Sequence, residues 1–264
     1  FLSRPNRFIA HIEIDGKTEI CHVKNTGRCK ELLTENATVF VQKSDNPSRK
    51  TQYDLIGVLK GERIINMDSQ IPNKVFGEWV KSSGFFGNLT LIKAEKTYGN
   101  SRFDYYLETE TDKIFVEVKG VTLEEDGVVM CPDAPTERGL KHINELCQCI
   151  KDGYKACIFF IIQMDNVKYF TPNRRTHPAF ADALKKAAEN GVEFAMVRLG
   201  YRGLVSGEIV EDSNARYNLQ EASRHGIKLG AYFFSTAITA EEAVEEARFM
   251  SVAILHGLRR AVII

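Results

Sequence analysis

The feature that most constrains the fold is an almost unbroken apolar run at Ala156–Gln163, ACIFFIIQ. Apolar residues at nearly every position are typical of a strand that is buried on both faces at the centre of a sheet. Two helical patterns flank this run: Thr136–Asp152, which begins after a proline and ends before a glycine, and the amphipathic stretch His177–Asn190. We therefore predict an α/β domain in this part of the chain.

The first third of the chain shows a different pattern, in which apolar and polar residues alternate. Asn6–Ile14 and Lys17–Val23 alternate on either side of Asp15-Gly16, which is a strong hairpin signal. Three further short strands are predicted at Ala37–Lys43, Tyr53–Leu59 and Arg63–Met67. With a helical turn at Lys30–Leu33, these strands fit an OB-like barrel that binds oligonucleotides, and they fit a general small β-barrel equally well.

Charge and cysteine usage limit the classes of function. The 264 residues have a formal net charge of zero, so any binding to nucleic acid must depend on local basic patches. Residues 1–60 hold ten Lys/Arg against seven Asp/Glu, a balance of +3. The six cysteines form no CxxC pair, and most of them interrupt apolar patterns, as small buried residues do. Free thiols, with no leader-like or membrane-spanning pattern, lead us to expect a cytoplasmic protein without a membrane partner.

The segment Ser101–Lys119 is the most informative for chemistry. Two strands, Phe103–Leu107 and Ile114–Val118, are joined by a polar stretch. Alternation predicts that Glu117 and Lys119 share one face of the second strand. If the turn is centred between residues 110 and 111, Asp104 lies directly opposite Glu117, with Cβ atoms about 5 Å apart.

Two carboxylates at that separation are best explained by a shared divalent cation. We therefore predict that Asp104 and Glu117 bind Mg²⁺ or Mn²⁺, which polarises a phosphodiester and lowers the pKa of a bound water. Lys119 would orient or deprotonate that water or stabilise the charge that develops on phosphorus. The alternative is an ordinary exposed hairpin, because Glu-x-Lys is common on strands.

Basic residues elsewhere could contact phosphates. Arg138, Lys141 and His142 fall on the first turns of the predicted helix, with Arg138 and His142 four residues apart on one face. Arg28 follows a turn at Asn25–Gly27 that would expose backbone N–H groups together with a cation. The alternative for the helix residues is a solvated helix face. The alternative for the turn before Arg28 is a plain connection between a strand and a helix.

Six segments together closely resemble the sugar fermentation stimulation protein family, SfsA. They are Phe1–Phe8, His22–Leu33, Ile71–Lys74, Tyr98–Asp104, Val116–Leu123 and Pro132–Leu146, and the match runs in order to about Val192. The resemblance implies an OB fold joined to a PD-(D/E)xK nuclease domain, DNA binding, and nuclease activity on DNA or RNA. Its nuclease pattern falls on Asp104, Glu117 and Lys119, while Arg102, Glu137 and Arg138 match other polar positions of the family motifs. Cys131 stands where the family usually has an aromatic residue.

A second resemblance begins near Gly191. From there the sequence is similar to an internal slice of the β/α barrel of the glycosyl-hydrolase lysozyme (muramidase) family. The chain ends before the strand that carries that family's paired catalytic Asp and Glu, so we expect no muramidase activity.

Together these patterns predict a mixed α/β (α+β) chain of three parts. Residues 1–75 form an OB-like nucleic-acid-binding barrel, residues 76–200 a PD-(D/E)xK nuclease-like domain, and residues 201–264 a partial β/α-barrel fragment of the lysozyme type. The predicted function is a Mg²⁺- or Mn²⁺-dependent nuclease with catalytic residues Asp104, Glu117 and Lys119. The residues predicted to contact DNA, or RNA as a second candidate, are Arg28, Arg102, Arg138, Lys141 and His142. A non-catalytic DNA-binding regulator is the alternative, and a fragment of a cell-wall lysozyme is a weaker one.

Overall fold

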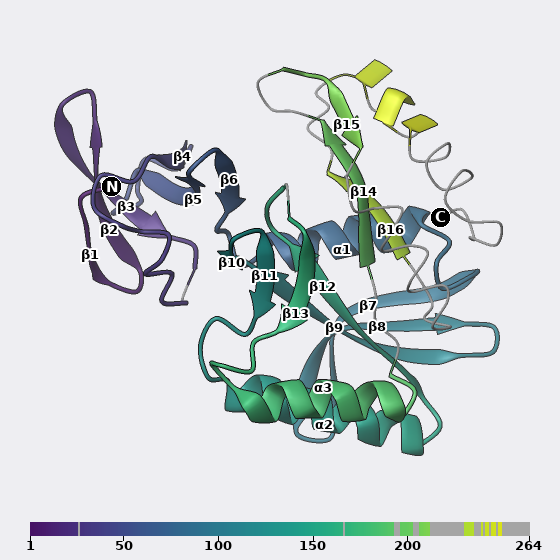
Figure 1. The fold of residues 1–264 in the computed structure, drawn as a ribbon. Helices are drawn as coiled ribbons and strands as arrows, with labels where there is room; N and C mark the ends of the chain where they lie inside the picture. Colours follow the sequence, from purple (N-terminus) through teal and green to yellow (C-terminus); the bar gives the residue numbers. More distant parts are fainter. Residues whose placement is uncertain are drawn as a thin grey trace. The chain divides into compact units, whose positions relative to one another are not determined.

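The computed structural model describes residues 1–25, 27–165, 167–192, 196–202, 206–211, 230–234, 239, 241–242, 244–246 and 248–249. Three α-helices are described along their full length, at Ile71–Ser82 (α1), Glu137–Lys151 (α2) and Pro178–Glu189 (α3) (Figure 1). The chain divides into two compact units. The first holds Phe1–Val75, Gly120–Glu137 and Ile162–Asp182, and the second holds Phe76–Lys119, Arg138–Ile161 and Ala183–Ile264.

The first unit begins with a six-stranded sheet. Its strands are Ser3–Asn6 (β1), Ile9–Ile14 (β2), Lys17–Val23 (β3), Val39–Lys43 (β4), Tyr53–Lys60 (β5) and Arg63–Asn66 (β6). The order is β1-β2-β3-β5-β4, and β6 pairs with β5. Asp15 and Gly16 both have positive φ angles, which is the backbone that a tight two-residue hairpin between β2 and β3 requires. The five strands predicted from alternation are therefore present, and β1 precedes them.

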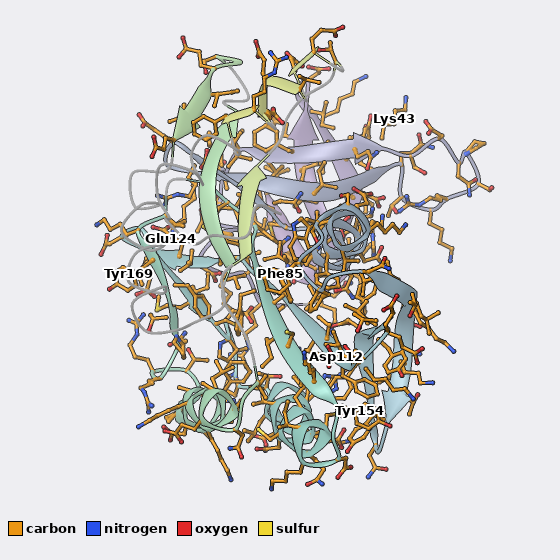
Figure 2. All side chains as sticks on the ribbon, turned by 90° about the vertical axis from the view of Figure 1, so that its right-hand side faces the viewer. Lys43, Phe85, Asp112, Glu124, Tyr154 and Tyr169 are labelled. Carbon is orange, nitrogen blue, oxygen red and sulfur yellow. The ribbon has the colours of Figure 1, made fainter. Side chains whose placement is uncertain are left out.

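A second, smaller sheet also belongs to the first unit. It contains Leu123–Glu125 (β10), Val128–Cys131 (β11) and Tyr169–Pro172 (β13), with β11 antiparallel to β10 and parallel to β13. Glu124, labelled in Figure 2, is 3% exposed and forms ion pairs with Lys60 at 2.8 Å and Arg63 at 2.9 Å. These pairs connect the small sheet to the β5–β6 hairpin within this unit.

The second unit is built on a four-stranded sheet. Its strands are Leu89–Tyr98 (β7), Ser101–Thr109 (β8), Lys113–Val121 (β9) and Lys155–Ile162 (β12), in the order β12-β9-β8-β7. Residues Ile114, Val116 and Val118 of β9 share one buried cluster with Phe76 and Val80 of α1. This is the apolar face that alternation predicts for β9. Phe85, labelled in Figure 2, packs against the same cluster.

The predicted hairpin is central in this sheet, because β8 and β9 are its two inner strands. The first four residues of the apolar run are buried, and Phe160–Ile162 are half-buried. The predicted central place of the run is wrong, since β12 ends the order of the described strands. Helices and aromatic side chains can bury both faces of an edge strand, so burial alone does not report the position of a strand in a sheet.

The C-terminal part of the second unit contains a three-stranded sheet. Met196–Arg202 (β14) pairs antiparallel with Ile209–Glu211 (β15) and parallel with Gly230–Phe234 (β16). The sequence pattern at Ala240–Met250 predicts a helix, and residues 241–242, 244–246 and 248–249 are helical. The sequence pattern at Ala215–His225 predicts a further helix, but these positions lie outside the described residues.

Candidate active site

The candidate site lies on the central hairpin of the second unit. Tyr105 pairs with Val116 and Tyr106 with Phe115, which is the register predicted from the sequence. The register, continued by one residue beyond Tyr105 and Val116, leads to Asp104 and Glu117. The Oδ2 atom of Asp104 accepts a hydrogen bond from the backbone N–H of Val118 at 2.8 Å. The carboxyl group of Asp104 therefore lies against β9, beside the residue that follows Glu117.

Glu117 is 2% exposed and is held from two sides. Its Oε1 atom lies 2.6 Å from Nδ1 of His142 and also contacts the ammonium group of Lys119. Burial raises the pKa of this carboxyl group, but the hydrogen bonds and charges of His142 and Lys119 outweigh burial and leave the pKa below its ordinary value. Glu117 is therefore a buried, ionised carboxylate at neutral pH.

The second oxygen of Glu117 is different. Oε2 is buried and has no hydrogen-bond partner among the described residues. A buried carboxylate oxygen without a donor is costly, and a cation is the partner that suits it best. No group of three or more His, Cys, Asp or Glu able to hold a metal ion occurs in the described part of the chain. The residues present fit Mg²⁺ or Mn²⁺, since Mg²⁺ commonly keeps several waters and takes only one or two protein carboxylates.

Four of the five residues predicted to contact nucleic acid are exposed: Arg28, Arg102, Arg138 and Lys141. Arg102 forms an exposed ion pair with Glu95 at 3.5 Å, and Lys141 donates a hydrogen bond to the carbonyl oxygen of Asn100 at 2.7 Å. Arg102, Arg138 and Lys141 belong to the second unit with the hairpin, whereas Arg28 belongs to the first. Their contacts with nucleic acid stay a prediction.

His142 does not lie on an exposed basic face of the helix, although that position was predicted for it. Its side chain is buried, hydrogen-bonded to Glu117, and in edge contact with the ring of Phe103 at 5.7 Å between centroids. The helix α2 turns this residue towards the sheet, while Arg138, one turn earlier, faces solvent. The pairing of His142 with Glu117 follows from no pattern in the sequence.

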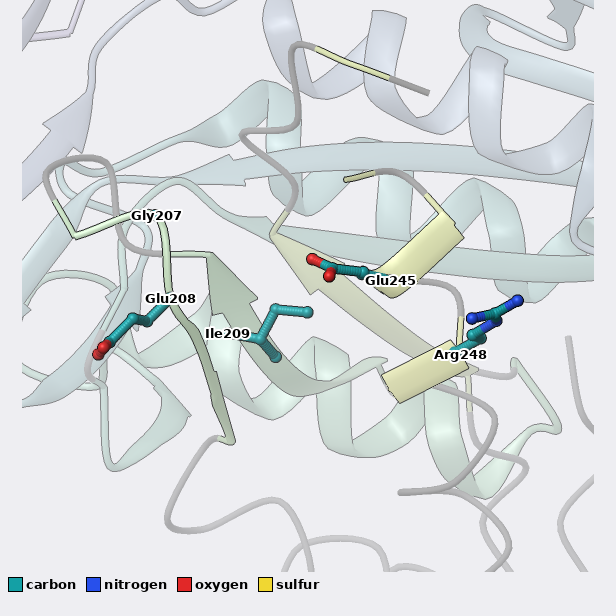
Figure 3. Close-up of a pocket in the computed structure, with 5 residues that line it drawn as sticks. All are labelled: Gly207, Glu208, Ile209, Glu245 and Arg248. Atoms are coloured by element: carbon teal, nitrogen blue, oxygen red, sulfur yellow. The ribbon is translucent and has the colours of Figure 1, made fainter. Parts of the chain in front are cut away.

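A surface pocket occurs in the C-terminal part of the second unit (Figure 3). It is lined by Gly207, Glu208, Ile209, Glu245 and Arg248. None of the residues predicted to carry chemistry lies in it, so the pocket is separate from the hairpin site.

Comparison with protein-family models gives two matches that follow one another along the chain. The SfsA N-terminal OB domain matches residues 2–67, and the sugar fermentation stimulation protein RE domain matches residues 70–203. The chain belongs to the SfsA family. An OB domain is thereby favoured over a general β-barrel for the first sheet, and the family match extends beyond the predicted limit near Val192.

Relatives and a solved structure agree with membership of the SfsA family. The sugar fermentation stimulation protein homolog of Ruminiclostridium cellulolyticum is 64% identical over 192 residues, which cover 73% of this chain and 85% of the relative. The homolog of Clostridium perfringens strain 13 is 49% identical over 218 residues, 81% of this chain and 93% of the relative. The structure of Pyrococcus furiosus SfsA in complex with Ca²⁺ is 32% identical, has a TM-score of 0.69, and covers 88% of this chain and 94% of its own. The lysozyme-type resemblance stays a prediction.

Proposed function

We propose that this member of the SfsA family is a metal-dependent nuclease that hydrolyses phosphodiester bonds in DNA or RNA, on a PD-(D/E)xK-type core. The observation that carries the proposal is the carboxylate of Glu117, which is buried and ionised and has one oxygen without a hydrogen-bond donor. It stands on a central strand with Asp104 against the same strand and Lys119 in contact.

Each residue of this group has a distinct role. Asp104 and Glu117 would hold Mg²⁺ or Mn²⁺, and the Ca²⁺ complex of the Pyrococcus furiosus relative supports a preference for a hard cation with oxygen ligands. When bound, the cation supplies a Lewis acid for the phosphodiester and the attacking water. Lys119 is 23% exposed, so its ammonium group can turn from Glu117 towards a water or a phosphate oxygen.

Nucleic acid is the proposed partner because exposed cations occur in both units. Arg102, Arg138 and Lys141 are exposed in the unit that carries the hairpin, and Arg28 is exposed in the unit that contains the OB domain. Such side chains bind phosphates, and their contribution decreases as salt is added.

A second candidate function is a DNA-binding regulator whose nuclease core is idle. The relatives named sugar fermentation stimulation protein homolog favour it, because that name describes an effect on metabolism and no reaction. The two candidates differ in one property, which is turnover that requires a divalent cation.

The test is to incubate purified protein with single- and double-stranded DNA and RNA in Mg²⁺, Mn²⁺ or EDTA. We expect cleavage with a divalent cation and none in EDTA. Lys119→Ala should abolish cleavage while nucleic-acid affinity stays largely unchanged, because one cation among several contributes little to binding. Salt-dependent binding without cleavage by the wild-type protein under all metal conditions would favour the regulator.

A further inference from the structure

We infer that His142 is a positioning residue, which orients the carboxylate of Glu117 so that its second oxygen is presented to a divalent cation. The inference rests on the proposed function and assigns a role to a side chain outside the Asp104, Glu117 and Lys119 group. It also replaces the contact with nucleic acid that was predicted for His142.

The hydrogen bond between His142 and Glu117 is short, buried and restricted in its geometry. Nδ1 of His142 and Oε1 of Glu117 are 2.6 Å apart, a short separation typical of a hydrogen bond to an ionised acceptor. The side chains are 6% and 3% exposed, so water does not compete for this bond. Phe103, which is fully buried, contacts the imidazole ring in edge geometry and limits its rotation.

The two donors on Oε1 differ in mobility. The side chain of Lys119 is 23% exposed on a flexible stem, whereas the imidazole of His142 is held inside the unit. If Lys119 turns towards a water or phosphate, His142 still occupies Oε1 and keeps the carboxylate in one orientation. The remaining oxygen, Oε2, has no hydrogen-bond donor among the described residues and is therefore the one left for a cation.

Supporting hydrogen bonds of this kind are common around metal sites. Carboxylates that bind metals are themselves hydrogen-bonded, and loss of such a partner typically weakens metal binding or activity by about 10- to 100-fold. A His142 that instead contacted phosphate would need an exposed ring, and its ring is buried.

The test compares two substitutions of nearly equal size, His142→Asn and His142→Leu. The amide nitrogen of asparagine falls near the position of Nδ1 and can still donate to Glu117, whereas leucine fills the same space without a donor. The primary readout is binding of Mn²⁺ alone to the full chain, from the electron paramagnetic resonance signal of free Mn²⁺. Asn144→Ala is the control, because Asn144 is exposed on the same helix.

We expect His142→Leu to weaken Mn²⁺ binding by about 10- to 100-fold, His142→Asn to recover most of the loss, and Asn144→Ala to match the wild-type protein. Nucleic-acid affinity in EDTA should change little in all three variants. The melting temperature should fall most in His142→Leu, because the buried carboxylate of Glu117 then loses a donor. Cleavage should fall in the same order as Mn²⁺ binding.

Four outcomes would overturn the inference. Wild-type Mn²⁺ affinity in His142→Leu would show that Glu117 needs no support, and equal losses in both variants would show that only the shape of the imidazole matters. Weaker nucleic-acid binding in EDTA with unchanged Mn²⁺ affinity would show a phosphate contact instead. Failure of the wild-type protein itself to bind Mn²⁺ would reject the proposed metal site, and with it this role of His142.

Discussion

Asp104 combines a structural contact with the proposed metal site. Its Oδ2 atom accepts the backbone N–H of Val118, so the side chain helps to fix β9 at the point where Glu117 is held. Removing its charge and removing its hydrogen bond are therefore separate experiments. An asparagine keeps an oxygen acceptor for Val118, whereas an alanine removes both.

We predict that Asp104→Asn abolishes metal-dependent cleavage while the protein stays folded. Nucleic-acid binding in EDTA should remain or tighten, because a negative charge is removed beside the proposed phosphate path. Cleavage assays, salt-dependent binding and a urea titration on the same preparation measure the three properties. Asp104→Ala should lose cleavage as well, with an additional cost of about 1 kcal/mol for the lost hydrogen bond. Full activity of Asp104→Asn would exclude this residue from the metal site.

At the scale of single residues, the sequence predicted the positions of the candidate site residues on the strands better than the position of His142 on the helix. Period-two alternation and one assumed turn were sufficient to place Asp104, Glu117 and Lys119, because a hairpin has a single register once its turn is set. His142 was assigned to a basic face from its spacing to Arg138. The spacing of His142 to Gly139, Ile143 and Leu146, all buried on α2, was the signal for an inward position. Its hydrogen-bond partner could not be predicted, since Glu117 is 25 residues away in the chain.

At the scale of elements, the contact between α1 and the central sheet depends on a helical glycine. A methyl group added at Gly77 would overlap the hydroxyl of Tyr105, and the Tyr105 ring packs on Phe76 at 4.9 Å between centroids. Glycine at position 77 therefore allows α1 to approach β8 closely, because any side chain there would meet Tyr105.

We predict that Gly77→Ala lowers the free energy of unfolding. Alanine is favoured over glycine in a helix by about 1 kcal/mol, but forced overpacking costs about 1–3 kcal/mol. Urea unfolding should show a net loss, and Tyr105→Phe should relieve part of it in the double variant because the hydroxyl is gone. Glu78→Ala, on the exposed side of α1, is the control and should be neutral. A stabilised Gly77→Ala variant would mean that Tyr105 moves freely.

A second element-scale prediction concerns Glu124, which joins β10 to the β5–β6 hairpin within the first unit. Burial raises the pKa of this carboxyl group, but Lys60, the N–H of Gly127 and Arg63 outweigh burial and leave it below its ordinary value. A lowered pKa in the folded state means that the ionised group stabilises the protein above its unfolded pKa. This stabilisation is lost as the pH falls through the folded pKa.

Glu124→Gln should therefore destabilise the protein at neutral pH by about 3 kcal/mol, the lower end for a broken buried pair, because Lys60 and Arg63 are partly exposed. The difference from wild type in urea unfolding should shrink below about pH 4.3, the ordinary value for glutamate, since protonated glutamate resembles glutamine. Glu125→Gln, in an exposed pair with Arg175, should change the stability by less than about 1 kcal/mol. A difference that is independent of pH would reject the role of the charge.

The elements that the sequence did not predict share a physical cause. The strands β1, β10, β11 and β13 have three or four residues each, too few to show a period. The ten residues of β7 are mostly exposed at the end of the described sheet, so they carry little apolar signal. Of these strands, β1, β7 and β10 pair with the next strand along the chain, whereas β13 pairs with β11, which is distant in the sequence. The helices α2 and α3 and the strand β12 were predicted to within a few residues, because their apolar patterns are local.

At the scale of the whole molecule, the described structure buries the thiol groups of the chain. All six cysteines are free and buried, as their places in apolar patterns predicted. Among the described helices, none is both long and apolar enough to span a membrane. Burial raises the pKa of Cys21 to about 11 and the pKa values of Cys29 and Cys149 to about 12.

We predict that the native protein is almost inert to the thiol reagent DTNB at pH 8. The attacking species is the thiolate, and both burial and a raised pKa keep its population low. The unfolded chain in urea should release colour from all six thiols, because each then has an ordinary pKa and full access. Absorbance after addition of the reagent, with and without urea, measures both states. Labelling of the native chain at the rate of the denatured chain would contradict the burial of the thiols. Slow labelling that becomes faster in Glu124→Gln would show that opening of the first unit exposes Cys21, Cys29 and Cys131.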